Sequence, residues 1–128
     1  MVTSVEIPYS IAAALPSLAV LDITNEVAHD VSAAPFGDGI AYVSSGERSL
    51  VRISEREGGL FEDLECFLER LVPKDTPERQ RILAFLLGPR TEQIPFSSGE
   101  LCLGRYQRIL IFSFDESCRS DWTLTLLG

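Results

Sequence analysis

The sequence predicts a single antiparallel α+β domain in which strands stand on both sides of a helical middle. Its 128 residues suit one domain, and an apolar fraction of 45% is enough for a core. Apolar residues recur every three or four positions in the middle of the chain and form short strand-like runs elsewhere. No repeat or linker divides the sequence, so we predict one domain over residues 1–128.

The first part of the chain is predicted to contain a strand and a short helix. Residues Val2–Ile7 form the first expected strand, which a proline closes. The apolar run Leu18–Ile23 leads to Thr24, a residue type that commonly caps helices. We therefore expect a helix that Thr24 caps and that ends near Ser32.

Two further strands are expected after a turn sequence. Gly37–Gly39 is interpreted as a hairpin turn, because its glycines match neither a dinucleotide fingerprint nor a phosphate-binding loop. The strands that follow it are Ile40–Ser44 and Ser49–Ile53.

The helical middle contains two predicted helices. Residues Leu60–Leu71 place apolar side chains on one face, and Val72-Pro73 ends this helix. Thr76–Glu78 combines a capping residue, a proline and an acid, which predicts the start of a second helix that ends at Gly88-Pro89.

Beyond Pro89 the pattern is that of strands separated by short polar turns. The expected strands are Gln93–Phe96, Leu101–Leu103, Arg105–Phe114 and Trp122–Leu126. Strands before and after a helical middle favour an antiparallel α+β domain.

Charge and hydropathy exclude several classes of partner. Eleven basic and nineteen acidic residues give a net charge of −8, which repels nucleic acid and anionic membranes. The apolar stretch Ile11–Val20 lacks the preceding basic residues of a signal peptide, and no run is long enough to span a bilayer. We therefore expect a cytoplasmic protein with no nucleic-acid or membrane partner.

Few residues are suited to catalysis or to transition-metal binding. The single histidine, His29, is interpreted as a surface residue of the short helix, and the three cysteines contain no C-x-x-C pair. Two charged groups remain, one around Arg48, Arg52 and Glu55–Glu57 and one at Pro77–Arg81. In a helix Arg79 and Arg81 would lie about 200° apart, so at most one of them faces a given site. We expect a carboxylate or anion as the partner of Arg79.

Four stretches give the chain a resemblance to a known family. They are Leu21–Thr24, Glu57–Leu60 continuing to Asp63–Glu65, Leu86–Pro89, and Gly104–Gln107 continuing to Phe114-Asp115. In order and spacing the sequence resembles the YjbQ-like family of secondary thiamine-phosphate synthase-type proteins. The resemblance implies antiparallel sheets packed as a sandwich with two to three short helices, assembled as a homotrimer. The apolar residues on both faces of Ile109–Phe112 and Leu124–Leu127 agree with a neighbouring subunit.

The family's functional positions are altered in this sequence. A histidine of the family aligns with Gly46, its His-x-His motif aligns with Arg79–Arg81, and its loop asparagine aligns with Ser54. In the Gly-x-Trp segment, Gly104 and Gln107 match the motif, whereas the tryptophan aligns with Tyr106. The acids that persist in the candidate pocket are Glu55, Glu57 and Asp63.

These substitutions change the chemistry that the site can support. A guanidinium is permanently protonated, so it neither coordinates a metal nor shuttles a proton as an imidazole does. We expect no bound metal or cofactor; the alternative is Mg²⁺ at Glu55, Glu57 and Asp63. Arg48 with Arg79 or Arg81 would instead bind a small anion, or these arginines would pair with Glu47, Glu55 or Glu57 and fill the former site.

Three functional hypotheses follow. The favoured one is a pseudoenzyme of unknown physiological role that lacks the family's metal-dependent activity. The alternatives are an active transferase on thiamine-type phosphorylated substrates and a non-catalytic subunit of a hetero-oligomer.

Overall fold

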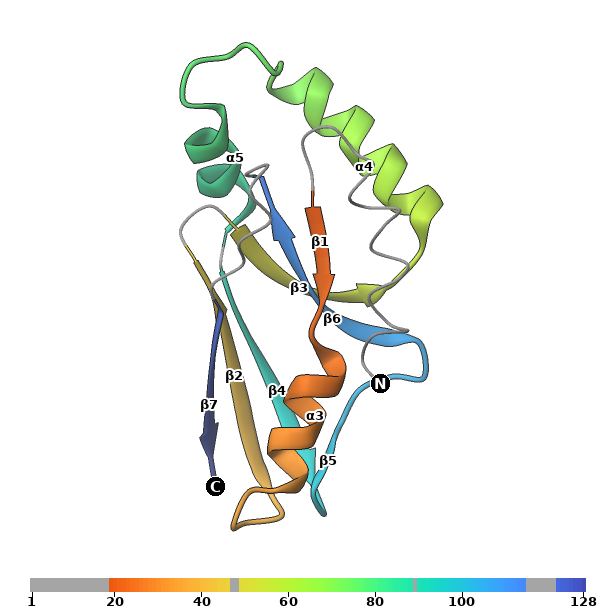
Figure 1. Ribbon diagram of the computed structural model, residues 1–128, viewed down its shortest axis with the longest axis vertical. Coiled ribbons are helices and arrows are strands. Elements are labelled where there is room, and N and C mark those ends of the chain that lie inside the picture. The colour runs from red at the N-terminus through yellow and green to blue at the C-terminus, as the bar shows by residue number, and fades with distance from the viewer. Residues whose placement is uncertain (1–18, 47–48, 89, 115–121) are drawn as a thin grey trace.

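The computed structural model describes residues 19–46, 49–88, 90–114 and 122–128, and these form two antiparallel sheets and three helices (Figure 1). The three-stranded sheet has the order β1-β6-β3, with β1 at Ala19–Asp22, β6 at Gln107–Ser113 and β3 at Ser49–Glu55. The four-stranded sheet has the order β5-β4-β2-β7, with β5 at Glu100–Leu101, β4 at Thr91–Ser97, β2 at Gly39–Ser45 and β7 at Trp122–Leu127. The helices are α3 at Thr24–Ser32, α4 at Gly58–Leu71 and α5 at Arg79–Leu87. The predicted antiparallel α+β class is confirmed.

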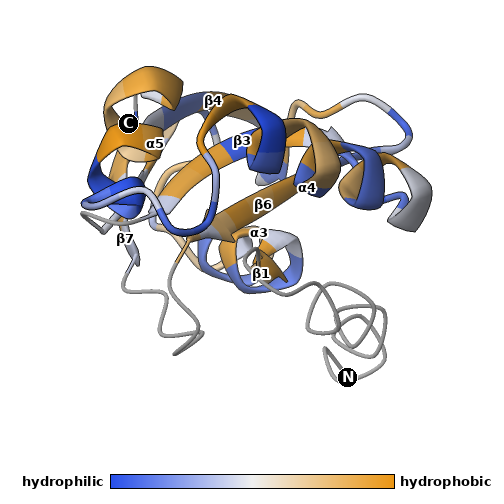
Figure 2. Cartoon of the chain, turned by 90° about the horizontal axis from the view of Figure 1, so that it is seen from above, coloured by the Kyte–Doolittle hydropathy of each residue, from blue (hydrophilic) through white to orange (hydrophobic). Residues whose placement is uncertain are grey.

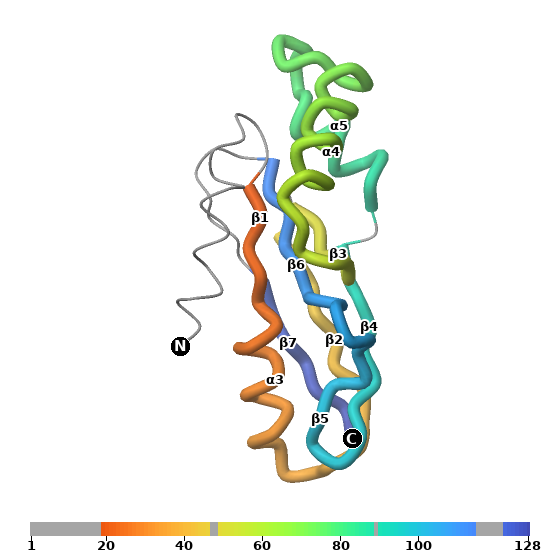
Figure 3. Tube along the Cα trace, turned by 90° about the vertical axis from the view of Figure 1, so that its right-hand side faces the viewer, coloured from red at the N-terminus to blue at the C-terminus, as the bar shows by residue number. Residues whose placement is uncertain are grey.

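The three-stranded sheet lies between two hydrophobic clusters, and strand β6 contributes to both. Ile109 and Ile111 pack towards the four-stranded sheet and α3, whereas Leu110 and Phe112 pack towards α4 and α5. Figure 3 shows α4 and α5 along one side of the upper sheet, and α3 continuing the line of β1 beside the four-stranded sheet. Both apolar faces of β6 are therefore covered within one chain, so this strand needs no neighbouring subunit to bury it.

Helix α4 forms where the sequence predicts it, but only part of its apolar face is buried. Phe61 and Leu68 are buried, together with Glu65. Leu60, Phe67 and Leu71 of the predicted apolar face are between 45% and 57% exposed. Figure 2 shows both hydrophilic and hydrophobic residues along this helix. The Glu57 side chain caps the helix by accepting a hydrogen bond from the Leu60 N–H at 2.8 Å. Val72 is extended and follows the last helical turn.

Helix α5 begins later than the sequence predicts. Its first residue is Arg79, because Glu78 adopts a left-handed conformation with φ of 60° and cannot continue a right-handed helix. Thr76 takes part in a turn instead, in which its carbonyl oxygen accepts a hydrogen bond from the Arg79 N–H at 3.2 Å. The prediction that Thr76 caps this helix is therefore wrong.

Thr24 is the first residue of α3, and its side chain makes no capping bond within the helix. Its N–H and its hydroxyl both donate to Asp22 Oδ1, at 2.9 and 2.6 Å. The same hydroxyl accepts the Ile109 N–H at 2.8 Å. Thr24 thus ties the start of the helix to strands β1 and β6, in place of the capping role that we expected.

The Gly37–Gly39 sequence joins α3 to β2, so the prediction of a hairpin turn there is wrong. The tight hairpin of this region is Ser98-Gly99, between β4 and β5, with Gly99 at φ 77°. The two turns contact each other, because the Gly99 N–H donates to the Gly37 carbonyl at 2.9 Å. A Cβ at Gly39 would collide with the Leu127 carbonyl, which explains the glycine beside β7.

Two smaller differences concern the strands. Of the predicted strand Leu101–Leu103 only Leu101 lies in a strand, β5 at Glu100–Leu101. Strand β6 begins at Gln107, because residues 105 and 106 form a turn. The predicted strand Val2–Ile7 lies outside the described residues. Within the described part of the chain, no helix is both long enough and apolar enough to cross a membrane.

Candidate functional site

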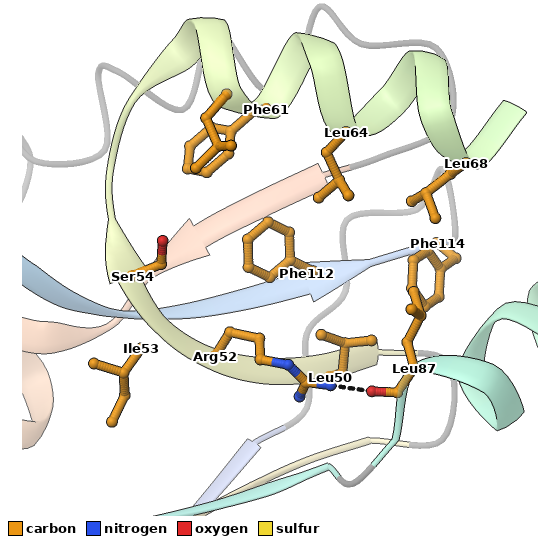
Figure 4. Close-up of a pocket in the computed structure, with 11 residues that line it drawn as sticks. Leu50, Arg52, Ile53, Ser54, Phe61, Leu64, Leu68, Leu87, Phe112 and Phe114 are labelled. Atoms are coloured by element: carbon orange, nitrogen blue, oxygen red, sulfur yellow. Dashed lines mark hydrogen bonds between the residues drawn. The ribbon is translucent and has the colours of Figure 1, made fainter.

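A cavity of about 300 Å³ lies between helix α4 and the three-stranded sheet (Figure 4). It is apolar apart from two polar residues, Arg52 and Ser54. Its lining comprises Leu50, Arg52, Ile53, Ser54, Leu60, Phe61, Leu64, Leu68, Leu87, Phe112 and Phe114.

The alternation of side chains along strand β3 and the pairing of β3 with β6 bring the lining residues together. Leu50, Arg52 and Ser54 alternate along β3 and so share the sheet face that α4 covers. Phe112 stands opposite Leu50 in the β3–β6 register and meets Phe61 of α4 edge to face, with ring centroids 5.7 Å apart. The cavity is thus framed by an aromatic contact that links the helix to the sheet.

The two polar lining residues differ in how firmly they are held. The Arg52 guanidinium donates through Nη1 to the Val51 carbonyl at 2.8 Å and through Nη2 to the Leu87 carbonyl. These bonds turn its charged end towards Leu87, as Figure 4 shows. The Ser54 hydroxyl makes a 3.4 Å contact with the carbonyl of its neighbour Glu55. That contact is long for a hydroxyl hydrogen bond, so the hydroxyl can turn to another partner at little cost.

A buried carboxylate at the end of β1 joins two strands, a helix and a loop. Asp22 is fully buried; its Oδ2 accepts from Arg108 Nε at 2.7 Å and from Arg56 Nη1 at 3.1 Å. Its Oδ1 accepts the two bonds from Thr24. Arg108 also reaches Asn25, with 3.5 Å between Nη2 and Oδ1. Every acceptor site of the buried charge is therefore directed at a donor, as a buried carboxylate requires.

This network lies on the same sheet face as the cavity. Leu110 of β6 pairs with Asp22 on one side and with Arg52 on the other, while Arg108 pairs with Ser54. Paired residues of antiparallel strands point to the same face. The ionic network therefore adjoins the Ser54 end of the cavity.

Sequence reasoning did not find either feature. One signal in the sequence could have pointed to the network. Asp22 follows directly on an apolar run, in the motif Leu21–Thr24, and a charge in that place needs a partner such as an arginine from another strand end. The cavity gives no local signal, because its lining comes from β3, α4, the end of α5 and β6.

Arg79 and Arg81, two of the three arginines proposed as anion ligands, do not line this cavity. Arg79 is 8% exposed, and its Nε donates to the Val72 carbonyl at 2.6 Å. The prediction of a carboxylate or anion as the partner of Arg79 is not confirmed, because among the described residues its Nε binds a backbone carbonyl and its Nη2 has no hydrogen-bond partner. Arg81 faces solvent and pairs with Glu78, with 2.9 Å between Nη1 and Oε1. Arg48 and Glu47 lie outside the described residues.

We expect Arg79→Met to lower the free energy of unfolding by about 1–3 kcal/mol, because it removes the buried hydrogen bond from Nε to the Val72 carbonyl. The loss should stay within that range, because Arg79 Nη2 has no hydrogen-bond partner among the described residues and methionine keeps the bulk of the side chain. Urea denaturation followed by circular dichroism measures the change. Arg81→Met, on the exposed position of the same helix, is the matched control. A loss above about 3 kcal/mol at position 79 alone would contradict this view and indicate a charge partner for Arg79.

The three acids of the alternative magnesium site serve other roles or face solvent. Glu57 Oε1 caps α4, and Glu55 and Asp63 are exposed. Within the ranges that the structure describes, no group of three or more His, Cys, Asp or Glu side chains is arranged to hold a metal ion. Among the described residues, Glu55, Glu57 and Asp63 are therefore not brought together as a group that could hold a metal ion.

The remaining family-motif positions form turns. The Gly46 carbonyl accepts the Ser49 N–H at 3.4 Å, and the Gly104 N–H donates to the Gln107 side chain at 2.6 Å. Tyr106 is exposed, with the Arg105 guanidinium 5.7 Å from its ring centroid. Ser54 is the only one of these positions that lines the cavity.

Comparison with known proteins supports the family resemblance. The family model described as "UPF0047 protein YjbQ-like" matches residues 13–128. A UPF0047 protein of Archaeoglobus fulgidus is 36% identical over 105 residues, which cover 75% of this chain and 81% of that protein.

Solved structures of family members have the same fold as this chain. An uncharacterised YjbQ/UPF0047 family protein from Clostridium acetobutylicum has a TM-score of 0.75 and 27% identity, covering 86% of this chain and 92% of that one. A hypothetical protein from Aeropyrum pernix has a TM-score of 0.76 and 27% identity, covering 87% and 90%. This chain therefore belongs to the UPF0047 (YjbQ-like) family.

Proposed function

We propose that this chain is a non-catalytic member of its family, in which the metal-dependent site implied by the resemblance has been replaced by structural contacts. The observation that carries the proposal is the Arg79 side chain. It occupies a position where the family resemblance places a histidine, and its Nε binds the Val72 carbonyl. It therefore fastens the start of α5 to the residue that follows α4.

The chemistry of the neighbouring positions supports the same view. Arg81 takes the second histidine position and faces solvent beside Glu78. Neither guanidinium offers a lone pair, and neither exchanges a proton near neutral pH. His29 is exposed on α3, at the far end of the structure from α4 and α5 (Figure 1). A general base would have to come from another residue type.

Assembly as a homotrimer remains a prediction. Large apolar side chains on the two upper helices support an interface there, since Phe67, Phe85 and Leu86 are all more than half exposed. The buried strand β6, by contrast, gives the prediction no support, because its two faces are covered within the chain.

A thiamine-phosphate synthesis assay on the purified chain tests the loss of activity. We expect no turnover above the blank with or without Mg²⁺ or Zn²⁺, because the histidine positions of the family carry Gly46, Arg79 and Arg81, none of which offers a side-chain lone pair to a metal. A family member that retains the histidines serves as the positive control. Turnover that a chelator or Arg48→Ala abolishes would contradict the proposal and favour the alternative of an active transferase.

A further inference from the structure

We propose that the cavity between α4 and the three-stranded sheet binds a small neutral molecule with an apolar body and one hydrogen-bonding oxygen. The ligand class is an aromatic or branched alcohol, phenol or ketone of roughly ten to fifteen non-hydrogen atoms. Of the positions altered in the family motif, Ser54 lines this site, whereas Arg79 and Arg81 do not.

The volume of the cavity sets the size of the ligand. At about 300 Å³ it stands at the lower end of the range of small-molecule pockets. An apolar protein cavity of roughly half that volume takes up benzene. A fused two-ring molecule therefore fits, whereas a nucleotide or a folded peptide does not.

The lining selects an apolar body. Phe61, Leu68 and Phe112 are buried and already packed in the hydrophobic cluster, so the walls exist before a ligand binds. Leu60, which also lines the cavity, is 45% exposed, so this part of the lining is in contact with solvent. A preformed apolar wall keeps the cost of ordering low on binding.

The polar residues select one uncharged oxygen. Ser54 points its hydroxyl from β3 into the space below α4, and its contact with the Glu55 carbonyl is long at 3.4 Å. That hydroxyl can donate to, or accept from, a ligand oxygen. The Arg52 guanidinium disfavours cations. An anion would have to lose its hydration between walls that are otherwise apolar, which is costly unless the charge is fully paired. A neutral ligand meets neither penalty.

Titration of the full chain with 2-naphthol and with naphthalene, followed by two-dimensional NMR, tests this site. We expect saturable shifts for residues of β3, α4 and β6 around the cavity with both probes, and tighter binding of 2-naphthol. Ser54→Ala should weaken 2-naphthol binding by about 3- to 10-fold, which is the loss of one neutral hydrogen bond, and leave naphthalene binding unchanged.

A filling variant and a matched control locate the site. Leu64→Trp should abolish the binding of both probes by occupying the cavity, while Phe85→Trp, on the exposed face of α5, should bind them as the original chain does. Leu60→Trp, at the solvent-facing side, replaces Leu64→Trp if that variant does not fold. The proposal is overturned if no saturable shift occurs, if binding survives in the filled variant, or if the shifts gather instead on the exposed face around Phe67 and Phe85.

Discussion

Replacing Asp22 with alanine is expected to lower the free energy of unfolding by about 3–5 kcal/mol, the usual cost of removing one partner from a buried ion pair. The carboxylate is fully buried, and its two oxygens accept from Arg56, Arg108 and Thr24. Its removal leaves two guanidiniums, about a quarter exposed, without their shared anion, and leaves the Thr24 N–H without an acceptor. Denaturant unfolding measured by circular dichroism gives the difference.

Two variants separate the network from the general effect of losing a charge. Asp30→Ala removes an exposed carboxylate from α3 and should change stability by less than about 0.5 kcal/mol. Asp22→Asn keeps the shape and one acceptor for Thr24 but removes the charge, so its cost should lie between those of the two alanine variants. If Asp22→Ala costs less than about 1 kcal/mol, solvent replaces the carboxylate for both arginines and the network does not hold the fold together.

The parts of the fold that the sequence predicts are those governed by local periodicity. Helix α4 and strands β2, β3 and β6 follow from the spacing of apolar residues along each segment. The start of α5 did not follow, because Glu78 adopts a left-handed conformation that its residue type does not announce. Thr24 was mistaken for a helix cap because its tertiary partners, Asp22 and the Ile109 N–H, override the local preference.

The candidate site depends on contacts between distant parts of the chain. Asp22 meets Arg56 and Arg108 across 34 and 86 residues of sequence, so no window of a single segment contains the network. The charged group around Arg56 is visible in the sequence, but nothing in that segment points to Asp22 as the partner of Arg56. The register of strands β1, β6 and β3 brings Asp22 close to Arg56.

The family resemblance indicates which histidine positions Arg79 and Arg81 occupy, whereas the structure shows what each side chain contacts. Alignment places Arg79 and Arg81 at histidine positions, and this predicts the loss of metal chemistry from residue type alone. Only the structure distinguishes the two, since one is buried against the Val72 carbonyl and the other pairs with Glu78 at the surface. An anion pocket that uses both would require a partner subunit or a different arrangement of α5.

Ile111→Ala is expected to produce the second large effect, a loss of about 2–5 kcal/mol in the free energy of unfolding. Ile111 is fully buried on β6, between Leu21 of β1 and Val51 of β3, and it faces the core that joins the two sheets. Because strands flank it on both sides, the backbone cannot collapse into the space that the shorter side chain leaves.

The same substitution at a partly exposed isoleucine shows whether burial is the cause. Ile40 on β2 is 36% exposed, so Ile40→Ala should cost about 1 kcal/mol or less in the same denaturation experiment. Equal losses at the two positions would mean that strand propensity, and not the sealed core between the sheets, determines the effect. A loss at Ile111 alone would show that the layer between the sheets is packed tightly, in contrast to the opposite face of β6, where Phe112 borders a cavity of about 300 Å³. Strand β6 would then have one tightly packed face that stabilises the fold and one face that borders a cavity large enough for a ligand.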